Sequence, residues 1–244
     1  MKVMKINYED TQSISNAWVR WYLSSQIVWI GKEKNYNEIE KLQNTSFGSF
    51  KWLWSDADTL LFQQDNLEFI GAVIKLNEPI IVNQDKINIS LIEEKNGNIK
   101  LSENKNFNCK LSDFTEYFVE DDTILCYSEK WNRIQPSIEI KISADFSFVI
   151  QNDELMGIVL YKASWHLLPD GIHVVEENTH IHPDLRVKLC RFFELIAIMD
   201  NDLTQIEESE LKNSLLEIYE EVSCYGELSY KALRDTIFNV LDYM

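Results

Sequence analysis

Residues 137–161 read SIEIKISADFSFVIQNDELMGIVLY, and this stretch decides the class of fold. Apolar side chains alternate with polar ones on both sides of Asp145, which is the period of a half-buried strand. Asp145 and Asn152-Asp153 are turn-forming residues between the runs. The next run, Leu155–Tyr161, is apolar at most positions, as in a strand that is buried on both faces. The stretch therefore predicts three strands, and the alternating apolar residues are Ile138, Ile140, Ile142, Phe146, Phe148 and Ile150.

The same period of two recurs upstream, from about Phe47. The run Leu67–Leu76 is apolar on both faces and predicts a buried central strand. Asn96-Gly97 is a strong hairpin signal, and Pro169-Asp170-Gly171 predicts a turn before a strand at Ile172–Val175. We expect about nine or ten strands, mostly antiparallel because the spacing between them is short. The other alternating positions are Phe50, Trp52, Trp54, Ile87, Ile89, Leu91, Phe107, Cys109 and Leu111.

Helical periodicity flanks the strands on both sides. Residues 10–25 carry an apolar stripe that predicts an N-terminal helix, and residues 36–43 predict a further helical turn. Pro183 suits the first position of a helix, Thr204 with Glu207 resembles a capping box for a second helix, and Ser229 is the expected cap of a third. The stripes are Ile14, Trp18, Trp21 and Tyr22 near the N-terminus, and Leu185, Leu189, Phe192, Ile196, Met199, Leu211, Leu215, Ile218, Val222, Leu233, Ile237, Val240 and Leu241 after Pro183.

These patterns predict an α+β fold with an N-terminal helix, a large and mostly antiparallel β-rich body, and a C-terminal three-helix segment. Residues 1–182 form the expected body, and residues 183–244 form an acidic helical segment that packs on it as one unit. The 244 residues are enough to bury a sizeable core without disulfides. The four cysteines have no paired spacing, so we expect reduced thiols rather than a zinc or redox site.

The composition excludes several classes of protein. Forty acidic and 23 basic residues give a formal charge of −17, which opposes nucleic-acid binding because that needs Lys and Arg to neutralise phosphates. A hydrophobic fraction of 45% excludes disorder, and no apolar run approaches the roughly 20 residues of a membrane span. The few glycines are too far apart for a nucleotide-binding loop. The N-terminal residues lack the apolar region of a secretory signal, so we expect a cytoplasmic protein with no cofactor, nucleic acid or membrane partner.

The negative charge is concentrated near the C-terminus. Residues 200–244 contain 11 acidic and 3 basic residues, a net charge of −8, whereas the preceding 199 residues have a net charge of −9. On the second predicted helix, most of the glutamates lie off the apolar stripe, so they form either a solvated face or a surface complementary to a basic protein. The predicted partner-binding residues are Glu207, Glu208, Glu210, Glu217, Glu220 and Glu221.

Two other patterns favour catalysis. His166, His173, His180 and His182 lie within seventeen residues, and His180 and His182 would share one face of an extended segment, where they would hold a divalent metal. Glu139 and Lys141, with Asp121 and Asp122 upstream, match the carboxylates and lysine of metal-dependent nucleases. The alternatives are a solvated histidine-rich segment and the polar face of an alternating strand.

The sequence favours a binding protein over an enzyme. Bacterial immunity proteins, which block toxic nucleases by occupying their cationic active sites, share its profile of acidic charge, many aromatic residues and no catalytic motif. We expect a soluble inhibitor of this type, whose partner is a basic protein such as a cognate toxin domain. The alternatives are a metal-dependent enzyme that uses the four histidines, and an interaction subunit of a larger assembly.

Overall fold

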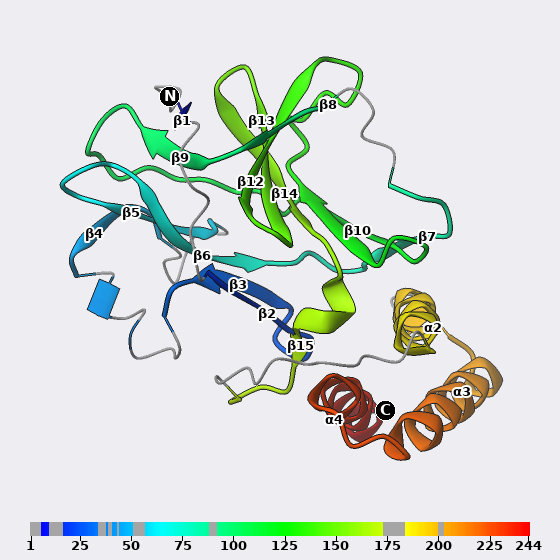
Figure 1. Cartoon of the computed structure of the whole chain (residues 1–244). Coiled ribbons are helices and arrows are strands. Elements are labelled where there is room, and N and C mark those ends of the chain that lie inside the picture. Colours follow the sequence, from blue (N-terminus) through cyan, green and yellow to red (C-terminus); the bar gives the residue numbers. More distant parts are fainter. Residues whose placement is uncertain are drawn as a thin grey trace.

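The computed structural model describes residues 6–9, 17–33, 38, 41–42, 44–50, 57–87, 92–172, 184–199 and 203–244, with 6–9 and 92 described by their backbone alone. This part of the chain has mixed α and β content. The body consists mostly of strands, and three long helices follow it in the sequence (Figure 1).

The larger sheet has seven strands in the order β7-β10-β11-β14-β13-β12-β8. Its neighbours are antiparallel except at the two edges, where β7 is parallel to β10 and β8 is parallel to β12. Residues 137–161 form three neighbouring strands, as predicted, and Asn152 and Asp153 both have the positive φ that a tight two-residue hairpin requires. The strands are β7 (Ile81–Asn83), β8 (Ile92–Asn96), β10 (Phe114–Phe118), β11 (Thr123–Tyr127), β12 (Ser137–Ser143), β13 (Phe146–Gln151) and β14 (Glu154–Leu160).

A second sheet has six strands in the order β15-β2-β3-β6-β5-β4, and only β15 is parallel to its neighbour. The run Leu67–Leu76 contains β6 in the interior of this sheet, which confirms the prediction of a central strand. A third, two-stranded sheet pairs β1 with β9. The strands are β1 (Ile6–Glu9), β2 (Trp18–Tyr22), β3 (Ile27–Gly31), β4 (Ser46–Ser49), β5 (Thr59–Gln63), β6 (Phe69–Lys75), β9 (Asn98–Leu101) and β15 (Leu167–Leu168).

The main hydrophobic core lies between the two large sheets and continues under the helices. Phe69 of the six-stranded sheet meets Phe148 of the seven-stranded sheet edge to face, with ring centroids 5.0 Å apart. The helices α2 (Asp184–Met199) and α4 (Leu228–Tyr243) contact β7 and β15, and α3 (Gln205–Ser223) packs on both helices (Figure 1). None of the described helices is long and apolar enough to cross a membrane.

The predicted N-terminal helix is wrong for the residues that the structure describes. Residues 18–22 form β2, which pairs with β3, whereas residues 10–16 lie outside the described part. Val19 and Trp21 point into the main core, and Arg20 and Tyr22 lie on the opposite face, so both faces of the strand are buried. Aromatic and β-branched residues favour such a strand, and their spacing matched a helical stripe by coincidence.

The predicted hairpin at Asn96-Gly97 is also wrong. The strands on either side of Gly97 do not pair with each other, because β8 pairs with β12 and β9 pairs with β1. Ile99 and Leu101 of β9 are buried in the main core, and this burial draws the chain away from β8. The alternating segment Phe107–Leu111 is not a strand either. Phe107 makes one isolated bridge to Ser49 of β4. The Cys109 carbonyl accepts from the backbone N–H of Asp58, and the side chains of Ser49 and Asp58 accept from the N–H groups of Cys109 and Leu111.

The helical predictions after Pro183 are confirmed, with one correction. Thr204 and Glu207 form the predicted capping box of α3, and the predicted stripe of this helix is buried. Helix α4 begins at Leu228 after an N-cap at Glu227, so Ser229 is a buried helical residue and not a cap. The helical turn predicted at 36–43 is seen at Glu38, Lys41 and Leu42, which have helical backbone. The strand predicted at 172–175 lies outside the described residues, except for Ile172.

Candidate functional site

The six glutamates predicted to bind a partner are all exposed on α3. The helix buries Leu211, Leu215, Ile218 and Val222 against its neighbours. Since these residues recur every three or four positions, they fill one face and leave the glutamates toward solvent. The six glutamates are therefore accessible from solvent, but their local surroundings differ.

Two of these glutamates pair with basic residues of α2. The Oε2 atom of Glu217 lies 3.4 Å from Nη2 of Arg191. The Oε2 atom of Glu221 lies 3.5 Å from Nη1 of Arg191 and also contacts the ammonium group of Lys188. The hydrogen bond from Lys188 holds the pKa of Glu221 below its usual value. Arg191 and Lys188 thus compensate part of the negative charge on this side of α3.

A third glutamate, Glu207, belongs to the helix cap. Its Oε2 atom accepts hydrogen bonds from the backbone N–H of Thr204 at 2.8 Å and from the Thr204 hydroxyl at 2.7 Å. These bonds lower the pKa of Glu207, the side-chain bond having the larger effect. Glu207 therefore has a structural role in α3, whatever it contributes to binding.

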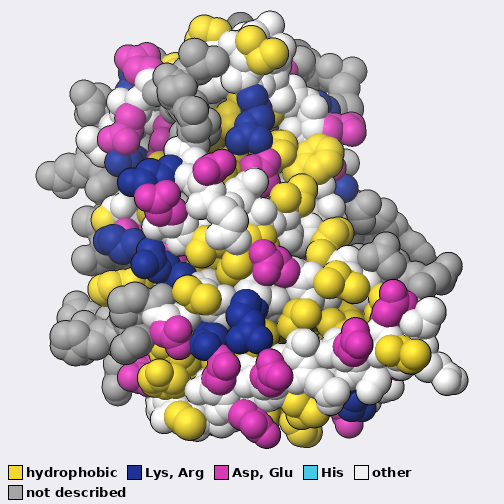
Figure 2. All heavy atoms as spheres, turned by 90° about the vertical axis from the view of Figure 1, so that its right-hand side faces the viewer, with side chains coloured by type: hydrophobic (Ala, Val, Ile, Leu, Met, Phe, Trp, Pro, Cys, Tyr) yellow, Lys and Arg dark blue, Asp and Glu magenta, His cyan; other side chains and the backbone are white. Residues whose placement is uncertain are grey.

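Glu208, Glu210 and Glu220 make no ion pair with any residue that the structure describes. Residues 204–210 are all exposed, and they include Ile206, which is 72% exposed. Figure 2 shows the side of the molecule on which α2 and α3 lie; acidic, basic and hydrophobic side chains are interspersed there. The acidic surface predicted along α3 is therefore divided, and its uncompensated part at the start of the helix contains an apolar residue.

The histidine cluster is described only at His166. His173, His180 and His182 lie outside the described residues. The Nε2 atom of His166 lies 3.4 Å from Oδ2 of Asp145, whose other oxygen pairs with Lys162 at 2.9 Å. The contact with His166 is the main reason that the pKa of Asp145 is lowered, and Lys162 lowers it further. Within the described ranges, no three His, Cys, Asp or Glu side chains lie close enough to hold a metal ion.

Of the nuclease-like residues, Asp122 lies away from Glu139 and Lys141, and Asp121 accepts a hydrogen bond from the backbone N–H of Ile87 at 2.9 Å. Glu139 accepts a hydrogen bond of 2.6 Å from the hydroxyl of Tyr161, and Lys141 pairs with Glu94 at 2.8 Å. Asp122 lies in the turn between β10 and β11, separated from β12 by β13 and β14. It accepts hydrogen bonds from the hydroxyls of Tyr117, at 2.9 Å, and Ser164, at 2.7 Å. Each carboxylate has its own internal partners, which favours the interpretation of Glu139 and Lys141 as the polar face of a strand.

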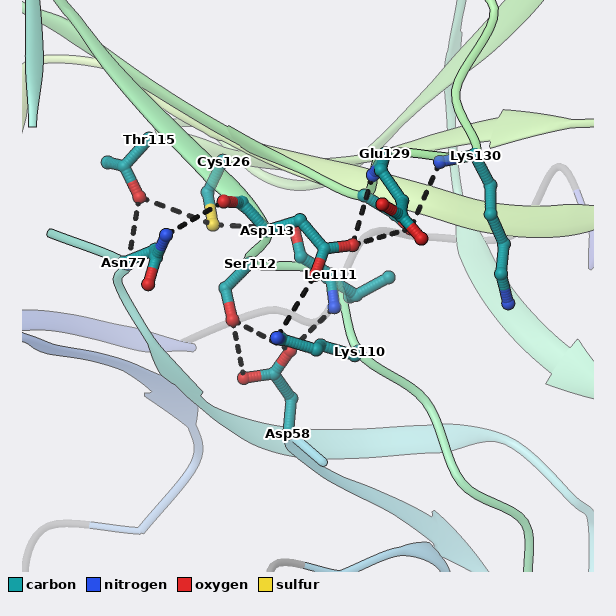
Figure 3. A network of polar contacts seen from close by, with 11 residues as sticks. Asp58, Asn77, Lys110, Leu111, Ser112, Asp113, Thr115, Cys126, Glu129 and Lys130 are labelled. Atoms are coloured by element: carbon teal, nitrogen blue, oxygen red, sulfur yellow. Dashed lines mark hydrogen bonds and ion pairs between the residues drawn. The ribbon is translucent and has the colours of Figure 1, made fainter. Parts of the chain in front are cut away.

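The most buried described carboxylate outside these patterns is Asp58, which is only 2% exposed and which the sequence analysis did not single out. Its Oδ2 atom accepts from the backbone N–H of Leu111 at 2.7 Å (Figure 3). Its Oδ1 atom accepts from the backbone N–H of Lys75 at 3.1 Å. Burial raises the pKa of Asp58 to about 6, against the lowering effect of these bonds. An acidic residue directly before an apolar run, as in Asp58-Thr59-Leu60-Leu61, was the available signal.

The geometry around Asp58 indicates a structural role. Asp58 also donates its backbone N–H to the carbonyl of Cys109 at 2.8 Å, so it fastens the segment before β10 to the start of β5. Further along this segment, Asp113 pairs with Lys110 at 3.1 Å (Figure 3). Asp113 also accepts from the Ser128 hydroxyl at 3.1 Å. The network therefore links the six-stranded sheet to the seven-stranded sheet.

The cysteines give no support to thiol chemistry. Cys126 is fully buried, and burial raises its pKa and that of Cys109 far above the usual value. All four thiols are free. Because the thiolate is the reactive form, such groups are poor nucleophiles. Trp21, Trp29 and Trp131 are buried and Trp165 is exposed, whereas Trp52 and Trp54 lie outside the described residues.

A surface hollow of about 230 Å³ is lined, within the described residues, by Phe50, Asn106, Phe107 and Asn108. Two aromatic rings and two amides can hold a ligand by stacking and hydrogen bonding. None of these four side chains titrates near neutral pH, so the lining offers no general acid or base. No protein family matches the sequence, and no curated protein is significantly similar to it.

Proposed function

We propose that this protein is a stoichiometric binding protein that neutralises a basic partner, as an immunity-type inhibitor of a bacterial toxin does in the cytoplasm. The observation that carries this proposal is the exposed start of α3. There, Glu208 and Glu210 have no ion pair among the described residues, and the exposed Ile206 precedes them by two and four positions on the same helix. No step of this function requires catalysis by the protein.

The charge of the chain supports the first stage of such binding. A formal charge of −17 attracts a cationic partner over several ångströms and raises the association rate at low ionic strength. Uncompensated carboxylates matter most, because Glu217 and Glu221 already share Arg191. Glu208, Glu210 and Glu220 would therefore contribute most of the steering from α3.

Ile206 supports the second stage, which is retention of the bound partner. Burying an isoleucine side chain contributes roughly 1.5–3 kcal/mol, and a central apolar contact ringed by charged groups is typical of binding hot spots. The first residues of α3 are held in place by the Thr204–Glu207 capping box, so little ordering is required when they bind. Charges would thus set the association rate, and Ile206 would set the dissociation rate.

The test measures binding kinetics with the toxin domain encoded beside this gene, using surface-immobilised toxin at several salt concentrations. The double variant Glu208→Lys, Glu210→Lys should associate about tenfold more slowly than the parent at low salt. The matched control, Asp65→Lys with Asp85→Lys, changes two exposed acidic residues of the body by the same total charge. It should slow association much less.

A second arm separates the two stages. Ile206→Ala should leave the association rate unchanged and raise the dissociation rate at least about tenfold. If the α3 and control variants slow association equally, only the total charge matters and the α3 surface is not the site. If the neighbouring genes encode no toxin and the protein binds no cationic protein, the proposed function is wrong.

A further inference from the structure

The segment 106–111 lies beside β4, which is the last strand of the six-stranded sheet in the described ranges. The outer backbone groups of such an edge strand are usually open to solvent and to other strands. All four residues of β4 are nevertheless buried. We call residues 106–111 the edge strap, because they run along this edge of the sheet.

Asn106 and Phe107 occupy both backbone polar groups of Gly48, the third residue of β4. The Gly48 N–H donates to Oδ1 of Asn106 at 3.1 Å, and the Gly48 carbonyl accepts from Phe107 N–H at 3.0 Å. The amide oxygen of Asn106 thus takes the place that a carbonyl of a neighbouring strand would have. A further strand would need these same two groups to pair with β4.

The backbone of β4 is adapted to this contact at Gly48. Its φ is 147°, and a Cβ atom at this position would lie 1.9 Å from the carbonyl oxygen of Leu60. Glycine adopts such a conformation without strain, whereas other residues do not. The sequence therefore supplies the residue that β4 requires at the point where the edge strap meets it.

The rest of the edge strap is anchored beyond the end of β4. The N–H of Cys109 donates to Oγ of Ser49 at 3.0 Å, and the N–H of Leu111 donates to Oδ2 of Asp58 at 2.7 Å. The Cys109 carbonyl accepts from Asp58 N–H at 2.8 Å. Alternate residues of the strap thus face the sheet, as the period of two predicted, but two of their acceptors are side chains.

The apolar side chains of the edge strap join the main core. The ring centroid of Phe107 lies 6.1 Å from that of Phe62, and Leu111 is fully buried. Both belong to the cluster that lies between the two large sheets. Detaching the strap would therefore open this end of the core as well as the edge of β4.

β4 has no charged side chain of its own to oppose pairing with another molecule. Its sequence is Ser-Phe-Gly-Ser, whereas edge strands are commonly protected by lysine, proline or an inward-pointing charge. The edge strap covers this uncharged edge and presents the exposed Asn106, Asn108 and Lys110 in its place. A separate segment thus supplies the protection that other edge strands carry in their own sequence.

We propose that the edge strap keeps β4 from pairing with β4 of a second copy of this chain. Without the strap, the N–H and carbonyl of Gly48 lie at an open edge, and an open edge is a template for another strand. In a solution of this protein the same edge of another molecule is available, and two such edges pair antiparallel about a two-fold axis. The strap is therefore an internal competitor of self-association. Because α3 takes no part in it, this inference and the proposed function can fail independently.

Asn106→Ala tests the edge strap at its contact with β4. The variant leaves the Gly48 N–H without its acceptor, so the strap should detach more often and self-association should become at least about tenfold stronger than in the parent. Sedimentation velocity of the full chain, from micromolar to about 100 µM protein, measures this association. Asn106→Asp keeps an acceptor oxygen at the same position and should behave as the parent. So should the matched control Asn108→Ala, which changes another exposed asparagine of the strap.

Amide hydrogen exchange at Gly48 identifies the edge that pairs. The Gly48 N–H should be protected in the parent and in Asn106→Asp, and it should exchange faster in dilute Asn106→Ala. In the associated form of Asn106→Ala it should be protected again, because a strand of the second copy then accepts from it. Rapid exchange of this amide in the associated form would show that another surface mediates the association, and the proposal would be wrong.

Two further variants separate the edge strap from a general loss of stability. Ser49→Ala removes the acceptor of Cys109 N–H, leaves Asn106 in place and should also strengthen self-association. Thr204→Ala removes a hydrogen bond of the α3 cap, away from β4, and should not associate more than the parent. The proposal is overturned if Asn106→Ala and Ser49→Ala associate no more than the parent. It is equally overturned if Thr204→Ala associates as strongly as they do, because lower stability alone then explains the effect.

Discussion

At the scale of single residues, Asp58 shows how a buried charge is retained in this fold. Its carboxylate is desolvated, which raises its pKa to about 6, yet it accepts two backbone N–H groups that belong to different segments. Leaving such buried donors without an acceptor costs about 1–3 kcal/mol each. The network therefore keeps an ionisable group in the interior because the backbone around it needs an acceptor.

This residue predicts a pH dependence of stability. The pKa of Asp58 is raised in the folded state from its ordinary value of 3.8 to about 6, so the native state binds the proton more tightly than the unfolded state does. Its contribution to stability is therefore greatest below pH 4 and is lost as the pH rises through about 6, by up to about 3 kcal/mol.

Asp58→Asn should remove this dependence. The measurement is the free energy of unfolding in urea at several pH values between 4 and 7. The variant should be less stable than the parent, and the difference between the two should grow as the pH is lowered. Its amide also presents a donor where the carboxylate accepted a hydrogen bond, which should cost about 1–3 kcal/mol. Parallel pH profiles for the two proteins would show that Asp58 does not titrate in this range.

At the scale of elements, the sequence predicted α3 more accurately than β2. The capping box and the stripe of α3 are local signals, because helix contacts join residues three or four positions apart. The segment Trp18–Tyr22 has no comparable local signal of its conformation. Its partners are β3 and the distant β15, and pairing with them overrides a helical spacing of aromatic residues.

The capping box of α3 predicts a measurable loss of stability when its hydroxyl is removed. Thr204→Ala removes the hydroxyl that accepts from Glu207 N–H and donates to the Glu207 carboxylate. The expected cost is about 1 kcal/mol in the free energy of unfolding. Thr204→Ser keeps the hydroxyl and should restore most of it. Equal stability of the alanine and serine variants would show that the box contributes nothing in solution.

At the scale of the whole molecule, Phe193 of α2 joins elements that are distant in the sequence. Its ring centroid lies 6.0 Å from that of Trp21 in the six-stranded sheet and 5.6 Å from that of Tyr117 in the seven-stranded sheet. One helical residue thus packs against both sheets. From this contact we expect the helical segment and the body to unfold together.

Phe193→Ala tests that prediction. The free energy of unfolding of the variant should be about 3–5 kcal/mol lower than that of the parent, which is the usual cost of replacing a buried phenylalanine by alanine. The unfolding transition by tryptophan fluorescence, which reports on the body because all the described tryptophans lie there, should shift to lower denaturant together with the helical circular dichroism signal. A shift of the helical signal alone would show that residues 183–244 unfold separately.

The sequence by itself determined the class of the elements and the distribution of charge. Alternation at 137–161, the helical stripes after Pro183 and the acidic residues of α3 are properties of neighbouring residues, so they can be read locally. Only the tertiary structure decided that Glu217 and Glu221 meet Arg191, that Asp58 bridges two sheets, and that the residues beside Asn96-Gly97 join different sheets. It also placed Asn106 and Phe107 against Gly48 of β4. These features depend on pairings between distant segments, whose free energy comes from burial and hydrogen bonding across the fold rather than from local sequence.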